Sequence, residues 1–229
     1  MKAKVIAIAG PVGVGKSTVI KVLTYFLNKS GLKIKSTYIK AFHGPSYLLW
    51  KFVRHILALR ENGRLASWYI IGKVNPRITQ VLLLISIYLD TIIIPFILML
   101  RVKLPKALGI TVLVEEYLLG TLLEYAYSFY RLEKGAQLHH LLPFKALTSL
   151  CIKYKPDFTI ILDANLSEIR RHWNIRGYGD PQVEYVLFQR GFLNRYIEVL
   201  YEEKEYVMKF NVGSISPVSI AEKVLLLLC

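Results

Sequence analysis

The chain has 229 residues, of which 54% are hydrophobic and 20% charged, and its net charge is +14. This length is enough for one α/β domain with a large core. The positive balance favours anionic ligands such as nucleotides, nucleic acid or an acidic membrane face, without choosing among them. Two cysteines far apart, Cys151 and Cys229, exclude a disulfide framework and a cysteine-based zinc site.

The first predicted element is a buried strand, Val5–Ala9, and a glycine-rich loop and a helix over residues 18–30 follow it directly. The loop, residues 10–17, reads Gly-Pro-Val-Gly-Val-Gly-Lys-Ser and fits the pattern G-x-x-x-x-G-K-[ST]. A strand, this loop and a helix in that order are the context in which the pattern binds nucleotide phosphates. The apolar run before the loop is too short for a signal peptide, so we expect a cytoplasmic protein.

The residues of this loop are expected to share the binding of a nucleotide. Backbone N–H groups turn inward around phosphate oxygens, and the helix N-terminus adds a partial positive charge. Lys16 is expected to reach the β- and γ-phosphates, and the Ser17 hydroxyl to contact Mg²⁺. The expected cofactors are therefore ATP and Mg²⁺. The expected nucleotide-binding residues are Gly10, Val12, Gly13, Val14, Gly15, Lys16, Ser17 and Thr18.

Strand and helix patterns alternate along the rest of the chain. Strands are predicted over residues 32–39, 110–114, 158–162 and 206–212, and helices over residues 47–59, 118–132, 141–154, 166–176, 183–205 and 218–228. This alternation predicts an α/β fold with a doubly wound, mostly parallel five-stranded sheet and helices on both faces. Because no linker or repeat divides the sequence, we expect a single domain over residues 1–229.

Residues 81–100 form an ambiguous apolar segment with one charge, Asp90, and one proline, Pro95. Its length would permit a membrane span. A single span, however, would put the strand Val5–Ala9 and the strand over residues 110–114 on opposite sides of a bilayer, where they could not share a sheet. We therefore expect a helix buried in the core or at a dimer interface, with contact to a membrane surface as the alternative.

Two strand ends offer the acid that a phosphate loop needs, either to order Mg²⁺ or to take the acceptor's proton. These acids are Glu115 and Asp163. Arginines on a closing loop neutralise a transferred phosphoryl group and exclude water. The chain lacks the Asn-Lys-x-Asp motif by which GTPases recognise their base. The late arginines that we expect to form a positive cluster are Arg170, Arg171, Arg176, Arg190 and Arg195.

The order and spacing of these features resemble the thymidylate kinase branch of the nucleoside monophosphate kinases. Residues 10–18 match the phosphate loop of that family, residues 115–117 stand where it has Asp-Arg-Tyr, and residues 162–165 with Ser167 and Glu168 stand at its Leu-Asp-x-x-Pro-Glu stretch. Tyr196 stands at a tyrosine of the family. The positions that follow the family's lid, over about residues 170–184, are Arg170 or Arg171, Arg176, Gly177, Asp180 and Glu184.

The resemblance implies transfer of the ATP γ-phosphate to a nucleoside monophosphate or a similar small anionic acceptor. Glu115 would take the place of the family's aspartate near the acceptor and would hold Mg²⁺ together with Ser17. Lys16, Arg171 and Arg176 would stabilise the transferred group. A homodimer through the helix before the third strand is also implied, which suits the apolar segment over residues 81–100.

The acceptor side departs from the family pattern. Glu116 stands in place of an arginine, Pro181 in place of the arginine in the lid's Asp-Arg pair, and residues 40–45 in place of Arg-Glu-Pro-Gly-Gly-Thr. Lys40 or His43 could replace the lost acceptor arginine, although a lysine is no bidentate clamp. Two alternatives therefore stay open, a non-catalytic ATP-binding regulator or partner-binding dimer, and an ATPase that binds an acidic membrane or nucleic acid. Nucleic acid is the partner that we expect least.

Overall fold

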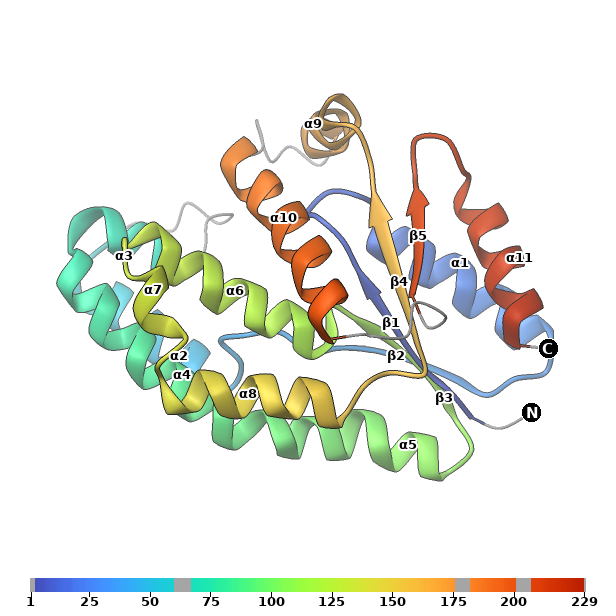
Figure 1. Ribbon diagram of the computed structural model, residues 1–229, viewed down its shortest axis with the longest axis horizontal. Coiled ribbons are helices and arrows are strands. Elements are labelled where there is room, and N and C mark those ends of the chain that lie inside the picture. The colour runs from blue at the N-terminus through green and yellow to red at the C-terminus, as the bar shows by residue number, and fades with distance from the viewer. Residues whose placement is uncertain (1–2, 60–66, 176–181, 201–206, 229) are drawn as a thin grey trace.

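The computed structural model describes residues 3–59, 67–175, 182–200 and 207–228. Its centre is a sheet of five parallel strands in the order β2-β3-β1-β4-β5, which confirms the predicted five-stranded α/β architecture (Figure 1). The strands are β1 (Val5–Ala9), β2 (Ile34–Tyr38), β3 (Thr111–Glu115), β4 (Phe158–Asp163) and β5 (Val207–Asn211).

The central strand β1 is buried along its whole length because it has a neighbour on each edge and helices over each face. Its unbroken apolar sequence is typical of a parallel strand covered on both sides. Val5 lies in register with Val112 of β3, and Ile6 with Phe158 of β4. The carboxyl ends of β1, β3 and β4 therefore meet at one edge of the sheet, where ligands bind in open α/β folds.

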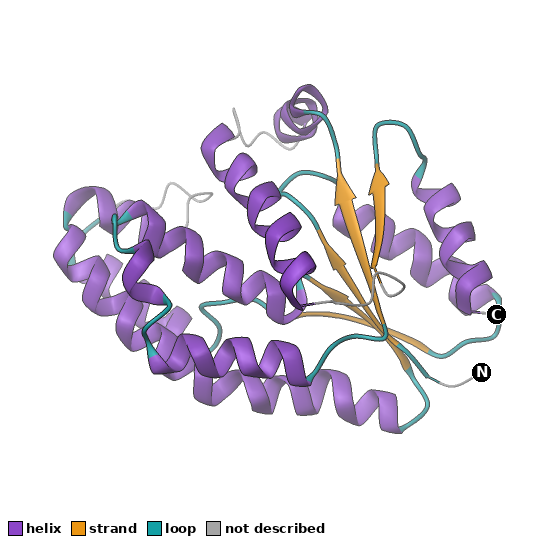
Figure 2. Ribbon diagram, viewed as in Figure 1, coloured by secondary structure: helices purple, strands orange, loops and turns teal. Residues whose placement is uncertain are grey.

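Helices cover both faces of the sheet (Figure 2). One face buries Ile6, Ile8, Leu113, Ile160 and Leu162 against three helices. These are α1 (Lys16–Lys29), α9 (Leu166–Ile175) and α11 (Pro217–Leu228). The helices on the other face are α2 (Pro45–Ile56), α3 (Ser67–Val74), α4 (Pro76–Leu98), α6 (Tyr117–Arg131), α7 (Gly135–Leu138), α8 (Leu142–Lys153) and α10 (Val183–Leu200).

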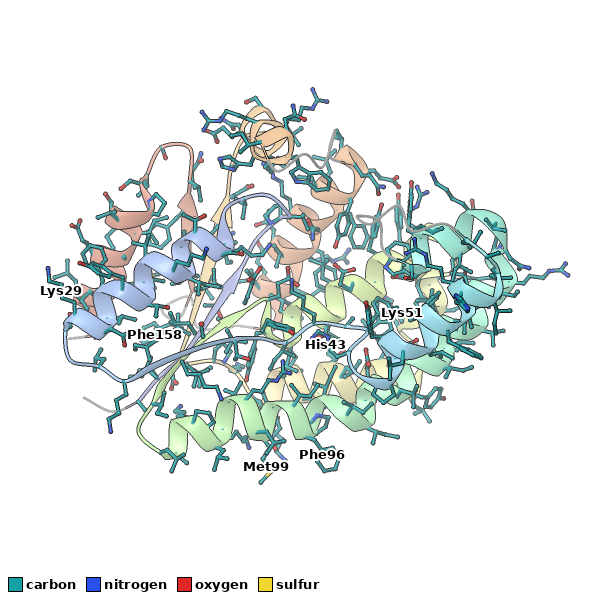
Figure 3. The ribbon with its side chains drawn as sticks, turned by 180° about the vertical axis from the view of Figure 1, so that it is seen from behind. Lys29, His43, Lys51, Phe96, Met99 and Phe158 are labelled. Atoms are coloured by element: carbon teal, nitrogen blue, oxygen red, sulfur yellow. The ribbon has the colours of Figure 1, made fainter. Side chains whose placement is uncertain are left out.

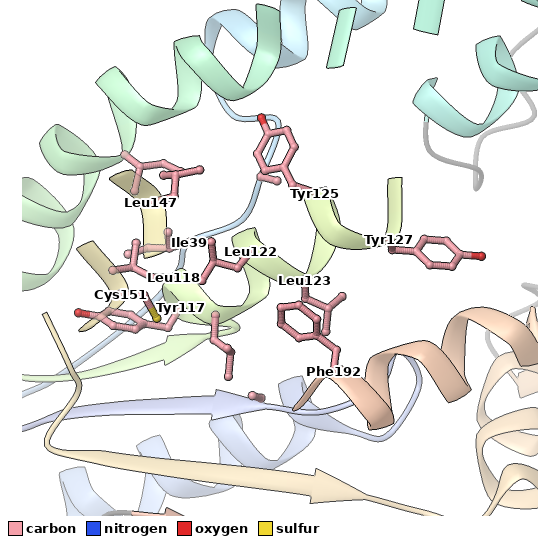
Figure 4. Packing of buried hydrophobic residues seen from close by; sticks show 14 of the residues in the cluster. Ile39, Tyr117, Leu118, Leu122, Leu123, Tyr125, Tyr127, Leu147, Cys151 and Phe192 are labelled. Carbon is pink, nitrogen blue, oxygen red and sulfur yellow. The ribbon is translucent and has the colours of Figure 1, made fainter. Parts of the chain in front are cut away.

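The second face carries the larger of the two hydrophobic clusters. Ala7, Val112 and Val114 of the sheet pack there against the helical layer, and α6 lies at the centre of the cluster in Figure 4. Helices α3 and α7 belong to this layer and were not predicted from the sequence. Both are short, at 8 and 4 residues, so they offer little periodicity to detect.

Helix α4 is longer than the apolar segment predicted, and it continues through a π-helical turn, Met99–Lys103, into α5 (Leu104–Ala107). It begins at Pro76 because the side chain of Asn75 caps it, accepting from the Ile78 N–H at 3.1 Å. By length and composition alone, residues 76–107 could cross a membrane. The strands on either side of this helix in sequence, β2 and β3, are hydrogen-bonded neighbours, and β3 pairs with β1 in turn.

Helix α4 buries one face and exposes the other. Leu83, Ile87 and Ile94 are fully buried, as the predicted core helix requires. The opposite face carries a stripe of exposed apolar side chains, and Figure 3 shows two of them, Phe96 and Met99, pointing away from the rest of the chain. We call the stripe made by Val81, Ile85, Tyr88, Ile92, Phe96 and Met99 the outer face of α4.

Candidate functional site

The loop between β1 and α1 has a conformation that only glycine adopts without strain at three positions. Gly10, Gly13 and Gly15 have φ angles of 152°, 90° and 101°. A side chain would also collide with neighbours, because a Cβ on Gly10 would lie 2.3 Å from the Leu162 carbonyl oxygen. A Cβ on Gly13 would lie 2.3 Å from the indole nitrogen of Trp173. The spacing of the glycines therefore reflects both backbone shape and close packing.

Helices α9 and α10 hold this loop from outside. The Val12 N–H donates to Gln189 Oε1 at 2.9 Å, and Trp173 Nε1 donates to the Val12 carbonyl at 3.1 Å. His172 Nδ1 donates to the Gly13 carbonyl at 2.9 Å. None of these three side chains was predicted to belong to the site, since no motif contains them. Together they fix the loop at the residues that precede Lys16.

Lys16 lies folded back on its own loop and is only 6% exposed. Its ammonium donates to the carbonyls of Gly10 and Pro11, at 2.8 and 3.1 Å, and lies 3.5 Å from Glu116 Oε1. The contact with Glu116 was not predicted, although the sequence places an acid where the similar family has an arginine. Glu116 has a φ of 68° and precedes the first residue of α6, so its carboxylate reaches the phosphate loop.

Ser17 and Glu115 come together as predicted. The Ser17 hydroxyl donates to Glu115 Oε2 at 3.4 Å, because α1 starts beside the carboxyl end of β3. Hydroxyl and carboxylate oxygens are the ligand types that Mg²⁺ takes, and Mg²⁺ is usually held by one or two carboxylates with phosphates and waters. These two side chains fit such an ion. Among the described residues, no group of three or more His, Cys, Asp or Glu side chains could hold a metal alone.

Asp163, the other strand-end acid, is engaged elsewhere. Arg190 donates through Nε to Asp163 Oδ1 at 2.7 Å and also contacts the Ala164 carbonyl. The predicted cluster of late arginines is therefore divided in the structure. Arg190 pairs with Asp163, whereas Arg171 and Arg195 line two separate cavities. Arg176 lies outside the described residues, as do Gly177 and Asp180.

Arg171 lies on α9 at a cavity of about 260 Å³ beside the start of α1. Gly15, Thr18, His172 and Gly213 also line this cavity. Neither Glu115 nor Glu116 lines this space. Arg171 thus shares a cavity with two residues at the start of α1, Gly15 and Thr18. Val14, a further residue of the loop, is fully buried.

Lys40 completes a cluster of charges at the carboxyl end of the sheet. Its ammonium lies 3.6 Å from Glu116 Oε1 and 3.9 Å from Glu115 Oε1. Burial by itself would lower the pKa of Lys40, but the carboxylates of Glu116 and Glu115 outweigh it, so that the pKa is raised. Lys40 is therefore cationic, and it shares the Glu116 carboxylate with Lys16.

Glu124 lies on α6 about two turns beyond Glu116 and accepts a hydrogen bond from the Tyr185 hydroxyl. Burial, reinforced by the nearby Glu116 carboxylate, raises the pKa of Glu124 to about 7. The space between Gly10, Glu116, Glu124 and Gln189 measures about 10 Å³, roughly the room of one water molecule. In the sequence, the signal for this buried carboxyl group is a single acid within the otherwise apolar helix predicted over residues 118–132.

We expect Glu124→Gln to remove a pH dependence of stability. A glutamate has an ordinary pKa of 4.5, so the folded chain keeps a proton that the unfolded chain releases above that pH. The stability linked to protonated Glu124 is complete below about pH 4.5 and is lost as the pH rises through about 7. Urea denaturation at pH 5 and pH 8 measures the change in the free energy of unfolding between the two pH values. The exposed Glu198→Gln serves as control, and an equal pH dependence in both variants would contradict the expectation.

The loop after β2 is tied to α4 and α6 by a buried carboxylate. Asp90 accepts from the Phe42 N–H at 2.7 Å, the Ser46 hydroxyl at 2.6 Å and the Tyr125 hydroxyl at 2.7 Å. Phe42 and Gly44 have φ angles of 59° and 56°, so this loop adopts a conformation that costs free energy. Asp90 therefore fixes the segment over residues 40–45 that the sequence assigns to the acceptor side.

Comparison with known structures supports this architecture. The chain is similar to the thymidylate kinase from Candida albicans, with 17% sequence identity and a TM-score of 0.59, over 99% of this chain and 91% of that chain. No family model and no curated protein sequence matches the chain. At this level of identity the likeness shows the fold. The chain thus has the P-loop α/β fold of thymidylate kinase, together with the loop, hydroxyl and acid described above.

Proposed function

We propose that the protein is an ATP- and Mg²⁺-dependent phosphotransferase that transfers the γ-phosphate to a nucleoside monophosphate or a similar small anionic acceptor. The observation that carries this proposal is the glycine loop with Lys16 at its end and the Ser17–Glu115 pair beside it. The proposal treats residues 1–229 as a single kinase domain with a lid over about residues 170–184. The cytoplasmic location stays a prediction.

Each residue of the nucleotide side has a role in this proposal. The backbone of residues 10–18 would bind the phosphates, and Lys16 would neutralise charge on the β- and γ-phosphates. Mg²⁺, held by Ser17 and Glu115, would offset the charge that develops on the transferred group. Arg171 would contact the nucleotide from the cavity next to Thr18, and Arg176 would act on the transferred phosphoryl group.

The acceptor side is where this chain would differ from the kinase it resembles in fold. Lys40 supplies positive charge near Glu115, and His43 lies three residues further along the same loop, so these are the groups proposed to receive an anionic acceptor. The Glu116 carboxylate adds negative charge that would repel a second phosphate placed beside it. We therefore expect the acceptor to carry less negative charge than thymidylate, or to bind in a different orientation.

A second candidate is a non-catalytic ATP-binding regulator. The observation in its favour is the contact of Glu116 with Lys16, since a carboxylate already neutralises the ammonium on which transfer would depend. Both candidates require ATP to bind. They differ in whether any acceptor receives the phosphate.

The test measures ADP release from ATP and Mg²⁺ across a panel of nucleoside monophosphates, deoxynucleosides and other small acceptors, with ATP affinity determined by calorimetry. Release that depends on one acceptor supports the phosphotransferase and identifies the substrate class. ATP binding with no acceptor-dependent release supports the regulator instead. Absence of ATP binding to the folded chain would refute both candidates.

We also propose a homodimer formed through the outer face of α4. Val81, Ile85, Tyr88, Ile92 and Phe96 are between 43% and 65% exposed, and no charged side chain interrupts them. A straight apolar stripe on one helix is complementary to itself when a twofold axis crosses its middle. Contact of the same face with a membrane surface is the alternative.

We expect Ile92→Asp to halve the mass of the particle in solution. A carboxylate at 63% exposure in the monomer would be buried in the dimer without a partner, which is unfavourable. Light scattering after size exclusion would show a fall from twice the chain mass to 26.3 kDa. Leu226→Asp, on the exposed side of α11, is the matched control. A monomeric wild type that binds anionic vesicles through Ile92 would support the membrane alternative and reject the dimer.

A further inference from the structure

A cavity of about 660 Å³ opens between α6, α7 and α10, and no step of the proposed function uses it. Its volume lies in the range of pockets that hold small molecules. The walls are apolar and aromatic, with Phe188, Phe192 and Tyr196 from α10, Tyr130 from α6 and Leu138 from α7. Such a lining favours a ligand with a large apolar body.

The cavity is separate from the nucleotide site, although both use α10. Gln189 and Leu193 line the narrow space beside the phosphate loop and Glu116, whereas Phe188, Phe192 and Tyr196 line the cavity. No residue lines both spaces. A ligand in the cavity would therefore be recognised by a different set of side chains from those that meet ATP.

The aromatic rings form a continuous wall. Phe192 stacks on Tyr196 with ring centroids 4.2 Å apart and an angle of 17° between planes, and on Phe188 at 6.2 Å and 23°. Tyr130 extends this wall from α6, at 5.2 Å from Phe188. Rings that are already ordered by one another lose little conformational entropy when a ligand binds, so this wall is preorganised.

A glycine keeps the cavity open. Gly191 lies in the interior of α10, where glycine destabilises a helix relative to alanine. No turn or close contact requires it, because a Cβ added there would meet no atom within 4 Å. Gly191 lines the cavity, and Ala126 of α6 is a second small residue in its wall. The missing side chain therefore provides space.

The cavity also carries positive charge. Arg195 lines it beside the aromatic wall, and His139 lines it from the end of α7. Arg195 forms no ion pair with an acid in the described part of the chain. A guanidinium next to an apolar wall is suited to a single carboxylate, sulfonate or phosphate group.

We propose that this cavity binds an amphipathic small anion, with its apolar body against Phe188, Phe192 and Tyr196 and its anionic group on Arg195. The apolar body supplies most of the affinity, since burial of apolar area is the dominant favourable contribution. Arg195 supplies selectivity for the anion. The proposal does not depend on phosphate transfer, because none of its residues belongs to the nucleotide site.

The test uses two fluorescent probes with the same aromatic body, 1-anilinonaphthalene-8-sulfonate and the uncharged N-phenyl-1-naphthylamine. We expect Gly191→Leu to fill the cavity and to lower the affinity for both probes by about tenfold or more. Arg195→Gln is expected to lower only the affinity for the sulfonate probe. Arg170→Gln, on an exposed turn of α9, is the charge-matched control. Competition by decanoate and by 2-naphthoate then distinguishes a chain-like ligand from a ring-like one.

The outcome is decided by the pattern among variants. Equal affinities in the wild type and Gly191→Leu would overturn the site, since the probes would then bind elsewhere on the surface. Equal effects of Arg195→Gln and Arg170→Gln on the sulfonate would overturn the assignment of the anion to Arg195. Thermal unfolding shows whether Gly191→Leu is folded, and Ala126→Leu, which fills the cavity from α6, provides a second variant.

Discussion

Lys16→Ala is expected to reduce phosphate transfer by at least about 10²-fold, the scale seen when one preorganised donor is removed from a charged transition state. The ammonium is 6% exposed and directed into the loop by the carbonyls of Gly10 and Pro11. No other cation among the described residues contacts these carbonyls, so the loop would lose its positive charge toward the phosphates. The fold should survive, because the loop is also held by Gln189 and Trp173.

The measurement is ADP release with the acceptor that the panel identifies, together with ATP affinity. Lys21→Ala, an exposed lysine on the same helix, is the matched control, and circular dichroism confirms that both variants are folded. If Lys16→Ala transferred phosphate at the rate of Lys21→Ala, the proposed function would be wrong. If ATP affinity fell while no variant ever transferred phosphate, the regulator would be favoured.

Asp90→Ala is expected to cause the largest loss of stability, at least about 3 kcal/mol. The substitution removes the acceptor of the Phe42 N–H and of the Tyr125 hydroxyl and leaves the Ser46 hydroxyl only the Ser86 carbonyl, at 3.4 Å. Each buried unsatisfied group costs about 1–3 kcal/mol. Asp90→Asn retains one acceptor oxygen at the same place and should cost less. Urea denaturation of both variants measures the difference, and equal losses would contradict the role given to the hydrogen bonds.

The same pair of variants has a pH signature. Burial outweighs the three hydrogen bonds and raises the pKa of Asp90 above its ordinary value of 3.8. The stability that comes from the protonated form is complete below that value and is lost as the pH rises through the higher folded pKa. Asp90→Asn cannot ionise, so its stability should vary less with pH than that of the wild type above about pH 4.

The parts of the site that could be predicted from the sequence are those whose geometry is local or follows from the parallel sheet. The loop over residues 10–17 lies between a strand and a helix that its own neighbours specify. Glu115 could be placed near Ser17 because the carboxyl ends of β1 and β3 meet at one edge. The chain is similar in fold to a solved thymidylate kinase over 99% of its length, so the five-stranded architecture agrees with the resemblance.

The parts that escaped prediction depend on side chains with no fixed spacing from the motif. His172, Trp173 and Gln189 contact the loop only because α9 and α10 pack beside it, and packing of that kind leaves no periodic signal. In the sequence, Glu116 stands where the similar family has an arginine. Its contact with Lys16 depends on a local backbone conformation, a φ of 68° at Glu116, which the sequence pattern does not reveal. The apolar run that predicted this helix begins at residue 81. Helix α4 itself begins earlier, at Pro76, where the side chain of Asn75 caps it.

The contacts around the phosphate loop also set an order of events during synthesis. Gln189 is 177 residues from Val12, Trp173 is 161 residues from Val12, and His172 is 159 residues from Gly13. A ribosome releases the loop first and these partners much later, so a nascent chain carries the motif long before it carries the site. Contacts this distant in sequence form slowly. If the proposed nucleotide binding needs the loop held in this conformation, it would begin only after Gln189 has been synthesised.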